Sequence, residues 1–232
     1  MTSAFHGFDT AQDLAESLAD AIVGALSKAI ATRGSASLAV SGGSTPKRFF
    51  QTLSTRDMDW SKVTITLVDE RFVPPDNDRS NHLLVAQNLL QNKAAAAHFA
   101  SLYQAVASVE EAARLASEKT RQIGNPFDAV ILGMGSDGHT ASFFPGGSNL
   151  AKALDAGTPR GVITMEAEGA GEPRLTFTFA SLQDARLLIL HIEGDSKKQV
   201  LEKAQADGPE SEMPIRAILR RAASLVEIYW AP

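Results

Sequence analysis

Short apolar runs alternate along this chain with longer stretches whose apolar residues recur at helical spacing, and this alternation constrains the fold most. Residues 9–32 show the helical spacing clearly, with Leu14, Leu18 and Ile22 on one side. Runs rich in branched apolar residues read as buried strands, at 37–41, 63–68, 127–132 and 186–192. Strands that alternate with helices pack as a parallel sheet with helices on both of its faces.

We therefore predict an α/β fold, a three-layer α/β/α arrangement around a mostly parallel, Rossmann-like sheet. The 232 residues contain no repeat, low-complexity tract or linker, so we expect a single domain over residues 1–232. The remaining expected helices cover 109–123, 149–156 and 213–221, and the remaining strands 98–103, 161–165, 174–179 and 224–230. Polar and apolar residues alternate over 174–179, which predicts a half-exposed strand, and 167–173 is expected to be a mobile loop.

Capping residues predict where several helices begin. Asp9 or Thr10 is the expected N-cap of the first helix, which Gly34 closes. Three further starts are expected, with Thr45 as N-cap before Pro46, with Ser80 capping a helix through Leu90, and with Asp195 or Ser196 capping a helix to Ala206.

The strand at 127–132 leads into a glycine-rich segment that ends in His139, Gly133-Met134-Gly135-Ser136-Asp137-Gly138-His139. Glycines let backbone N–H groups approach a ligand, and ligands of open α/β sheets bind beyond the carboxyl ends of strands. Histidine has an unperturbed pKa near 6.5, so a histidine here can take a proton near neutral pH. A plain turn with a surface histidine is the structural alternative.

The same segment spells the dinucleotide-binding spacing Gly-x-Gly-x-x-Gly. That motif needs a crossover helix, which Pro145-Gly146-Gly147 would stop, and an acidic residue at the end of a second strand about 20 residues on, which is missing. Both observations disfavour dinucleotide binding. A Gly-x-Ser-x-Gly nucleophile motif is absent.

Two other strands also lead into polar segments. Ser41-Gly42-Gly43-Ser44-Thr45 precedes a helix start, a pattern that cradles phosphate, although a capped tight turn would look the same. Asp69-Glu70-Arg71 follows the strand at 63–68, and its adjacent carboxylates point to opposite faces, so they are not an acid/base pair. Solvated charges at a strand end are the alternative. If the strands are neighbours, these segments meet 133–139, Arg174 and Lys197 in one region.

Composition excludes several classes of protein. The absence of cysteine rules out disulfides, thiolate catalysis and cysteine zinc sites, and fits a reducing compartment. A formal net charge of −5 argues against nucleic-acid partners and anionic membrane surfaces. No stretch approaches the roughly 18 apolar residues of a membrane span, and Met1 to Asp20 lacks a signal-peptide core, so we expect a cytoplasmic protein. A calcium loop at 76–87 is rejected, because Asn81 and Gln87 stand where glycine and glutamate are needed.

Three blocks taken together, 41–46 (SGGSTP), 69–74 (DERFVP) and 133–146 (GMGSDGHTASFFPG), resemble the bacterial 6-phosphogluconolactonases, which share a fold with the glucosamine-6-phosphate deaminases. The agreement in order and spacing extends across nearly the whole chain, including Arg174 and Gly194-x-x-Lys197. The resemblance implies hydrolysis of 6-phospho-D-glucono-1,5-lactone to 6-phosphogluconate in the pentose phosphate pathway, with no metal and no organic cofactor. The implied partner is this small phosphosugar lactone, and we expect a monomer or a weak homodimer.

The resemblance and the residues agree on the expected roles. His139 is the expected general base, oriented by Asp137, although a turn-stabilising role for this aspartate fits equally well. Arg174 and Lys197 are candidates for the phosphate, and Arg71 for either the phosphate or the developing oxyanion. The expected substrate-binding set is completed by Gly42, Gly43, Ser44, Thr45, Asp69 and Gly135.

Two other functions stay open. A deaminase/isomerase on the same fold uses the first acid of the Asp-Glu block as a proton shuttle and has an aromatic residue in place of Arg71. It also carries an Asn-Glu-Pro segment where this chain has Ser142-Phe143-Phe144-Pro145, and both departures favour the lactonase. A phosphosugar-sensing module without turnover would normally carry a basic DNA-binding domain, for which this chain has no room, but fold analogy alone leaves that function open.

Overall fold

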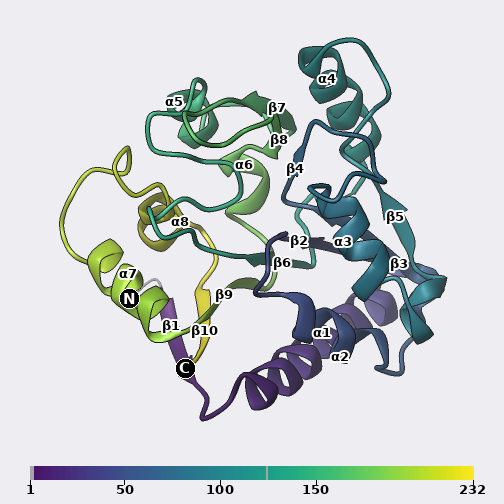
Figure 1. The fold of residues 1–232 in the computed structure, drawn as a ribbon. Coiled ribbons are helices and arrows are strands. Elements are labelled where there is room, and N and C mark those ends of the chain that lie inside the picture. Colours follow the sequence, from purple (N-terminus) through teal and green to yellow (C-terminus); the bar gives the residue numbers. More distant parts are fainter. Residues whose placement is uncertain (1–2, 124) are drawn as a thin grey trace.

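The structure is a computed structural model that describes residues 3–123 and 125–232, so Met1 and Thr2 of the N-terminal stretch considered above lie outside it. In the described part, the central sheet has seven strands in the order β1-β10-β9-β6-β2-β3-β5, and all its pairs are parallel (Figure 1). The strands are β1 (Ser3–Gly7), β2 (Ala36–Val40), β3 (Val63–Leu67), β5 (His98–Ala100), β6 (Ala129–Leu132), β9 (Leu188–Glu193) and β10 (Val226–Ala231). The predicted parallel α/β sheet is therefore confirmed.

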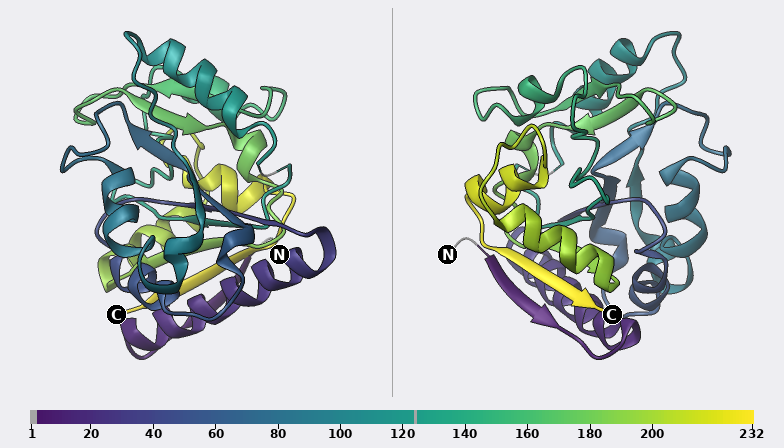
Figure 2. Two further views of the ribbon diagram at one scale, coloured as in Figure 1. Left: turned by 90° about the vertical axis from the view of Figure 1, so that its right-hand side faces the viewer. Right: turned by 60° about the vertical axis from the view of Figure 1, so that its left-hand side comes forward.

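Helices cover both faces of this sheet. On one side α1 (Ala11–Arg33) packs against β2, β6, β10 and α2 (Lys47–Ser54), and α2 contacts α3 (Asn81–Asn88). On the other side α7 (Asp195–Gln205) contacts β9 and α8 (Ile215–Arg221). The views in Figure 2 show β1 and β10 running between α1 and α7. This is the predicted three-layer arrangement.

A second, antiparallel sheet was not foreseen. Its order is β4-β8-β7, formed by β4 (Asp69–Arg71), β8 (Arg174–Phe177) and β7 (Val162–Met165). It contacts α4 (Val109–Thr120), and the short helices α5 (Leu150–Leu154) and α6 (Phe179–Leu182) contact each other. Figure 1 shows β7, β8, α4 and α5 on the side of the molecule away from α1 and α2.

This second sheet corrects two predictions. The strand at 174–179 is buried along β8 rather than half-exposed, because β8 is the middle strand of its sheet and α4 lies against it. The block 69–71 is not a solvated strand end, because it pairs with β8 as β4, and both Asp69 and Glu70 are buried.

The predicted caps are confirmed at two helices and wrong at two others. Thr10 caps α1, with its hydroxyl accepting from the Asp13 N–H, and Ser80 caps α3 in the same way. Thr45 does not cap α2, because the N-cap is the next residue, Pro46. The Pro46 carbonyl accepts the first helical hydrogen bond, from the Phe50 N–H at 2.8 Å. The N-cap of α7 is Gly194, which leaves Asp195 and Ser196 inside its first turn.

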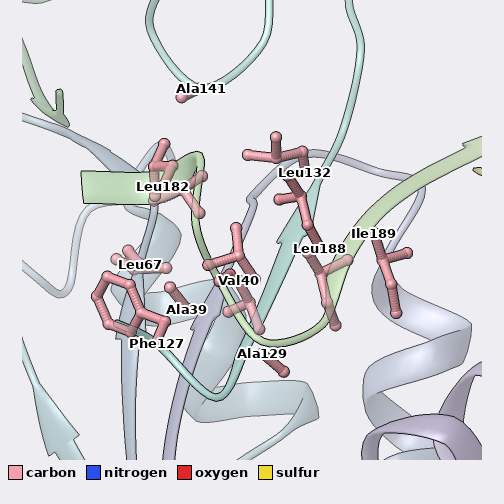
Figure 3. Close-up of a cluster of buried hydrophobic side chains, with 14 of the residues drawn as sticks. Ala39, Val40, Leu67, Phe127, Ala129, Leu132, Ala141, Leu182, Leu188 and Ile189 are labelled. Carbon is pink, nitrogen blue, oxygen red and sulfur yellow. The ribbon is translucent and has the colours of Figure 1, made fainter. Parts of the chain in front are cut away.

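Buried side chains from the middle strands of the sheet pack against one another in the core. Val40, Leu132 and Leu188, from β2, β6 and β9, lie together in the buried cluster of Figure 3. Burying one such side chain completely contributes about 1.5–3 kcal/mol, so a shift of register along these strands would be costly. Edge strand β1 escaped prediction, because Ser3–Gly7 contains no apolar run and is only partly buried.

Candidate active site

The cavity that holds the predicted residues opens where the strand order reverses. The next strand of the central sheet after β2 is its neighbour β3, whereas the next strand of this sheet after β6 is β9, on the opposite side. The loops that follow β2 and β6 therefore diverge and leave a crevice beyond the carboxyl ends of the strands. A cavity of about 380 Å³ lies there, large enough for a small ligand.

Ten of the eleven predicted site residues line this cavity: Gly42, Gly43, Ser44, Thr45, Asp69, Arg71, Gly135, His139, Arg174 and Lys197. The eleventh, Asp137, is hydrogen-bonded to His139. The prediction that distant loops meet in one region is therefore confirmed, and it depends on β2, β6 and β9 being neighbours in the sheet.

His139 and Asp137 form a hydrogen-bonded pair at the rim. The imidazole Nδ1 lies 2.6 Å from the Asp137 Oδ1, which also accepts from the His139 backbone N–H at 3.1 Å. The hydrogen bond with the His139 side chain lowers the pKa of Asp137 to about 2. An ionised carboxylate can only accept, so Nδ1 carries the proton and Nε2 is left as the basic nitrogen. Asp137 thus stabilises the turn and orients the imidazole, and the two predicted roles do not exclude each other.

The glycines of this loop act differently from what we predicted. Gly133 N–H donates to the Ser41 hydroxyl at 2.9 Å, Gly135 N–H to the His139 carbonyl at 2.8 Å, and Gly138 N–H to the Gly135 carbonyl at 3.2 Å. Protein acceptors therefore occupy the N–H groups that we expected to face a ligand.

Gly135 instead makes room for the histidine. A Cβ added there would lie 2.2 Å from His139 Nδ1 and 2.6 Å from Asp137 Oδ1. Glycine is therefore needed at position 135, because a side chain there would displace the His139–Asp137 pair.

The chain from Gly133 to Asn149 contains no helix, so the crossover helix that the dinucleotide-binding motif requires does not follow these glycines. Just after His139, Ala141 adopts φ +48°, a left-handed conformation that costs a non-glycine residue about 1 kcal/mol. Side-chain hydrogen bonds flank it, from Thr140 Oγ1 to the Gly133 carbonyl at 2.8 Å and from Ser142 Oγ to Asp69 Oδ2 at 2.6 Å. They hold the strained loop in one position beside the cavity.

Arg174 links the second sheet to the cavity. Its Nη2 donates to the Ala170 carbonyl at 2.6 Å, and its guanidinium lies 5.5 Å from the ring centre of Phe144. The Phe144 ring in turn lies 4.7 Å from the His139 ring. Burial lowers the pKa of Arg174, and the nearby Asp69 carboxylate opposes this shift.

Arg71 and Lys197 complete the positive lining. Arg71 Nη1 donates to the Arg79 carbonyl, while its Nε is buried and has no hydrogen-bond partner within the described residues. Burial lowers the pKa of Lys197, and Asp137 opposes this shift. Three cations and one carboxylate therefore line a cavity in a chain of net charge −5, as expected for a small anionic ligand.

Sequence reasoning missed several lining residues. Asn81 at the start of α3 and His191 on β9 are both buried, and His191 Nε2 donates to Glu193 Oε1 at 3.0 Å. His191 had a signal, since it is the lone polar residue in an apolar run, whereas nothing in the sequence distinguished Asn81 from an ordinary helix start.

A metal-binding cluster and a membrane-spanning helix are both absent from the described part of the chain. Among residues 3–123 and 125–232, no group of three or more histidine, aspartate or glutamate side chains could hold a metal ion. Within the same ranges, no helix combines the length and apolarity needed to cross a bilayer.

The chain is similar to known proteins over its whole length. A family model described as glucosamine-6-phosphate isomerases/6-phosphogluconolactonase matches residues 9–230. A Rhizobium meliloti (strain 1021) protein named 6-phosphogluconolactonase is 67% identical over 232 residues, all of both chains. A Mesorhizobium japonicum protein of the same name is 49% identical over 228 residues, 98% of this chain and 95% of the relative. A crystal structure of a 6-phosphogluconolactonase from Shewanella baltica OS155 matches with a TM-score of 0.95 at 40% identity, covering 99% of this chain and 98% of that one.

Proposed function

The chain belongs to the family of glucosamine-6-phosphate isomerases and 6-phosphogluconolactonases, and from this premise we propose that it acts as a 6-phosphogluconolactonase with His139 as its general base. It is an enzyme that hydrolyses 6-phospho-D-glucono-1,5-lactone to 6-phospho-D-gluconate, a step of the pentose phosphate pathway. One observation carries the role of the base: the His139–Asp137 pair borders a small cavity that is lined by three cations.

The reaction needs an activated water, a stabilised oxyanion and a protonated leaving group. His139 Nε2 takes a proton from water as the water oxygen bonds to the lactone carbonyl carbon. Asp137 holds the Nδ1 proton and stabilises the imidazolium that forms. The tetrahedral intermediate then collapses, the bond from the carbonyl carbon to the ring oxygen breaks, and the imidazolium returns its proton to that oxygen. The new carboxylic acid ionises near neutral pH, so each turnover releases one proton.

The cations divide between the two ends of the substrate. Arg174 and Lys197 bind the phosphate, together with the hydroxyls of Ser44 and Thr45, since phosphate favours arginine forks and lysine point charges. Arg71, whose buried Nε has no partner within the described residues, is available to the phosphate or to the oxyanion. Asp69 lies near Arg174 and supports its charge.

The deaminase alternative is less well supported by the geometry. It requires the first acid of the Asp-Glu block to shuttle protons, but Asp69 Oδ2 already accepts from the Ser142 hydroxyl at 2.6 Å, and Asp69 lies beside Arg174. The Asp69 side chain is thus already engaged by groups of this chain. A non-catalytic sensor would not need a histidine held by a carboxylate at the rim of the cavity.

The test is acid release from freshly prepared phosphogluconolactone, measured above the spontaneous background, with ammonia release from glucosamine 6-phosphate measured in parallel. We expect acid release and no ammonia. His139→Ala should lower kcat at least 100-fold, because a positioned general base contributes about 10²–10⁴-fold. A His139→Ala enzyme that releases acid at the wild-type rate would refute the assignment of the base.

We further propose that the chain works in the cytoplasm as a single domain over residues 1–232, as a monomer or weak homodimer, without a nucleic-acid partner. The net charge of −5 and the absence of cysteine support this. Sedimentation equilibrium over a range of concentrations tests the oligomeric state.

A further inference from the structure

A completely buried carboxylate, that of Glu70, lies behind the cavity and takes no part in the mechanism above. Side chains alternate along a strand, so Glu70 lies on the face of β4 opposite Asp69 and Arg71. Its Oε1 accepts from the N–H groups of Arg71 at 2.7 Å and Asn81 at 2.8 Å. Its Oε2 accepts from the His82 N–H at 2.7 Å and the Ser80 hydroxyl at 3.1 Å. One side chain therefore joins β4 to the first turn of α3.

All four of these groups donate, so they require an acceptor at both carboxylate oxygens. Burial raises the pKa of Glu70, and the hydrogen bonds from Asn81, His82 and Arg71 oppose this shift. A glutamine at this position would have the same shape but would turn an NH₂ group toward one pair of donors. A buried donor without an acceptor is costly, so the backbone of Arg71 or Asn81 would move.

Asn81 carries this connection to the cavity. Its Nδ2 donates to the Asp69 carbonyl at 3.0 Å. Its Oδ1 lies against Gly42, where an added Cβ would be only 1.9 Å away. Asp69 Oδ2 in turn accepts from Ser142 in the loop that carries His139. Hydrogen bonds thus join Asn81 to Asp69 and Asp69 to the His139 loop, and close packing joins Asn81 to the Gly42 turn.

We propose that Glu70 and Asn81 are positioning residues that hold the Gly42 turn, β4 and the His139 loop at the separation at which Arg71 and His139 meet one substrate. The proposal rests on the lactonase function proposed above. Neither residue needs to touch the reacting atoms, because a misplacement of about 1 Å in a catalytic group can lower the rate about 100-fold.

The test compares Glu70→Gln and Asn81→Ala with a matched control, Thr66→Val. Thr66 is completely buried, its hydroxyl donates to the Ala100 carbonyl at 2.7 Å, and it does not line the cavity. All three variants should lower the melting temperature. In assays well below that temperature, kcat/KM should fall about 10- to 100-fold in Glu70→Gln and Asn81→Ala and stay within about twofold of wild type in Thr66→Val.

A second readout does not depend on turnover. Titration calorimetry with 6-phosphogluconate should show weaker binding in Glu70→Gln and Asn81→Ala than in Thr66→Val. Asn81→Ala keeps the backbone N–H that donates a hydrogen bond to Glu70, so this variant provides the test if Glu70→Gln does not fold. A wild-type protein without acid release would refute the lactonase function, and calorimetry would still compare the variants. Kinetics and binding equal to those of Thr66→Val would overturn the positioning role.

Discussion

Asp137→Asn keeps the shape of the side chain but replaces the charged acceptor of the His139 Nδ1 proton with a neutral amide. Nδ1 and Oδ1 lie 2.6 Å apart, and this bond lowers the pKa of Asp137 from 3.8 to about 2. A hydrogen bond to a charged group is worth about 1.5–3 kcal/mol, or about 10- to 150-fold in rate if it is lost only in the transition state. The Asp137 side chain is 49% exposed, so solvent screening reduces the expected loss in kcat to about 10- to 30-fold.

The sign of the pH dependence follows from the lowered pKa. Asp137 is ionised at every pH above its ordinary value of 3.8, and its stabilising contribution is lost only as the pH falls through 3.8 toward 2. Titration of Asp137 itself therefore cannot change the ratio of wild-type to variant kcat near neutral pH. A ratio that changed with pH there would mean that another group titrates.

The assay is acid release at saturating, freshly generated lactone, followed with a pH indicator and corrected for spontaneous hydrolysis. Asp155→Asn is a matched control, because Asp155 also accepts a backbone N–H in an exposed turn, from Gly157 at 2.9 Å, but lies outside the cavity. If Asp137 acts through the imidazole, Asp137→Asn should have no further effect in a His139→Ala background. An unchanged kcat in the single variant, or an additive loss in the double variant, would refute the reasoning.

Further predictions concern the phosphate and the histidine. Arg174→Ala and Lys197→Ala should each raise the KM for the phosphorylated lactone about tenfold or more and leave the KM for the unphosphorylated lactone nearly unchanged. Equal increases in KM for the two lactones would show that neither residue holds the phosphate. Burial lowers the pKa of Lys197, so its ammonium group loses its proton at a lower pH than an exposed lysine does. Binding of 6-phosphogluconate, measured by calorimetry, should therefore weaken as the pH rises toward this lowered pKa in the wild type and not in Lys197→Ala. Gly135→Ala would place a methyl group 2.2 Å from the His139 ring, so kcat should fall at least about tenfold with little change in melting temperature, and a wild-type kcat would contradict the described packing.

The sequence determined the class of fold, because that information is local. Branched apolar runs at 37–41 and 127–132 become β2 and β6 in an all-parallel sheet, and the spacing of Leu14, Leu18 and Ile22 places α1 almost to the residue. Ser80 and Thr10 could be predicted as caps because their hydroxyls bind N–H groups three residues away.

Only the tertiary structure decided which distant groups meet. The chain leaves β3 after Leu67 and pairs 69–71 with β8, more than 100 residues further on, so Glu70 becomes a buried acceptor rather than a solvated charge. Asn81 carries no signal of its own, because its role comes from lying against Gly42. The need for glycine at 135 likewise depends on where the His139 ring lies.

The sequence by itself thus determined most of the elements and most of the chemistry at their ends, since periodicity, caps and glycine loops are properties of neighbouring residues. Strand order, burial and the partner of each polar group were decided by packing, since the free energy of a buried charge depends on donors from other parts of the chain. For this protein, the histidine that we propose as the base was readable from its own loop, whereas the residues that hold that loop against the rest of the cavity became visible only in the folded molecule.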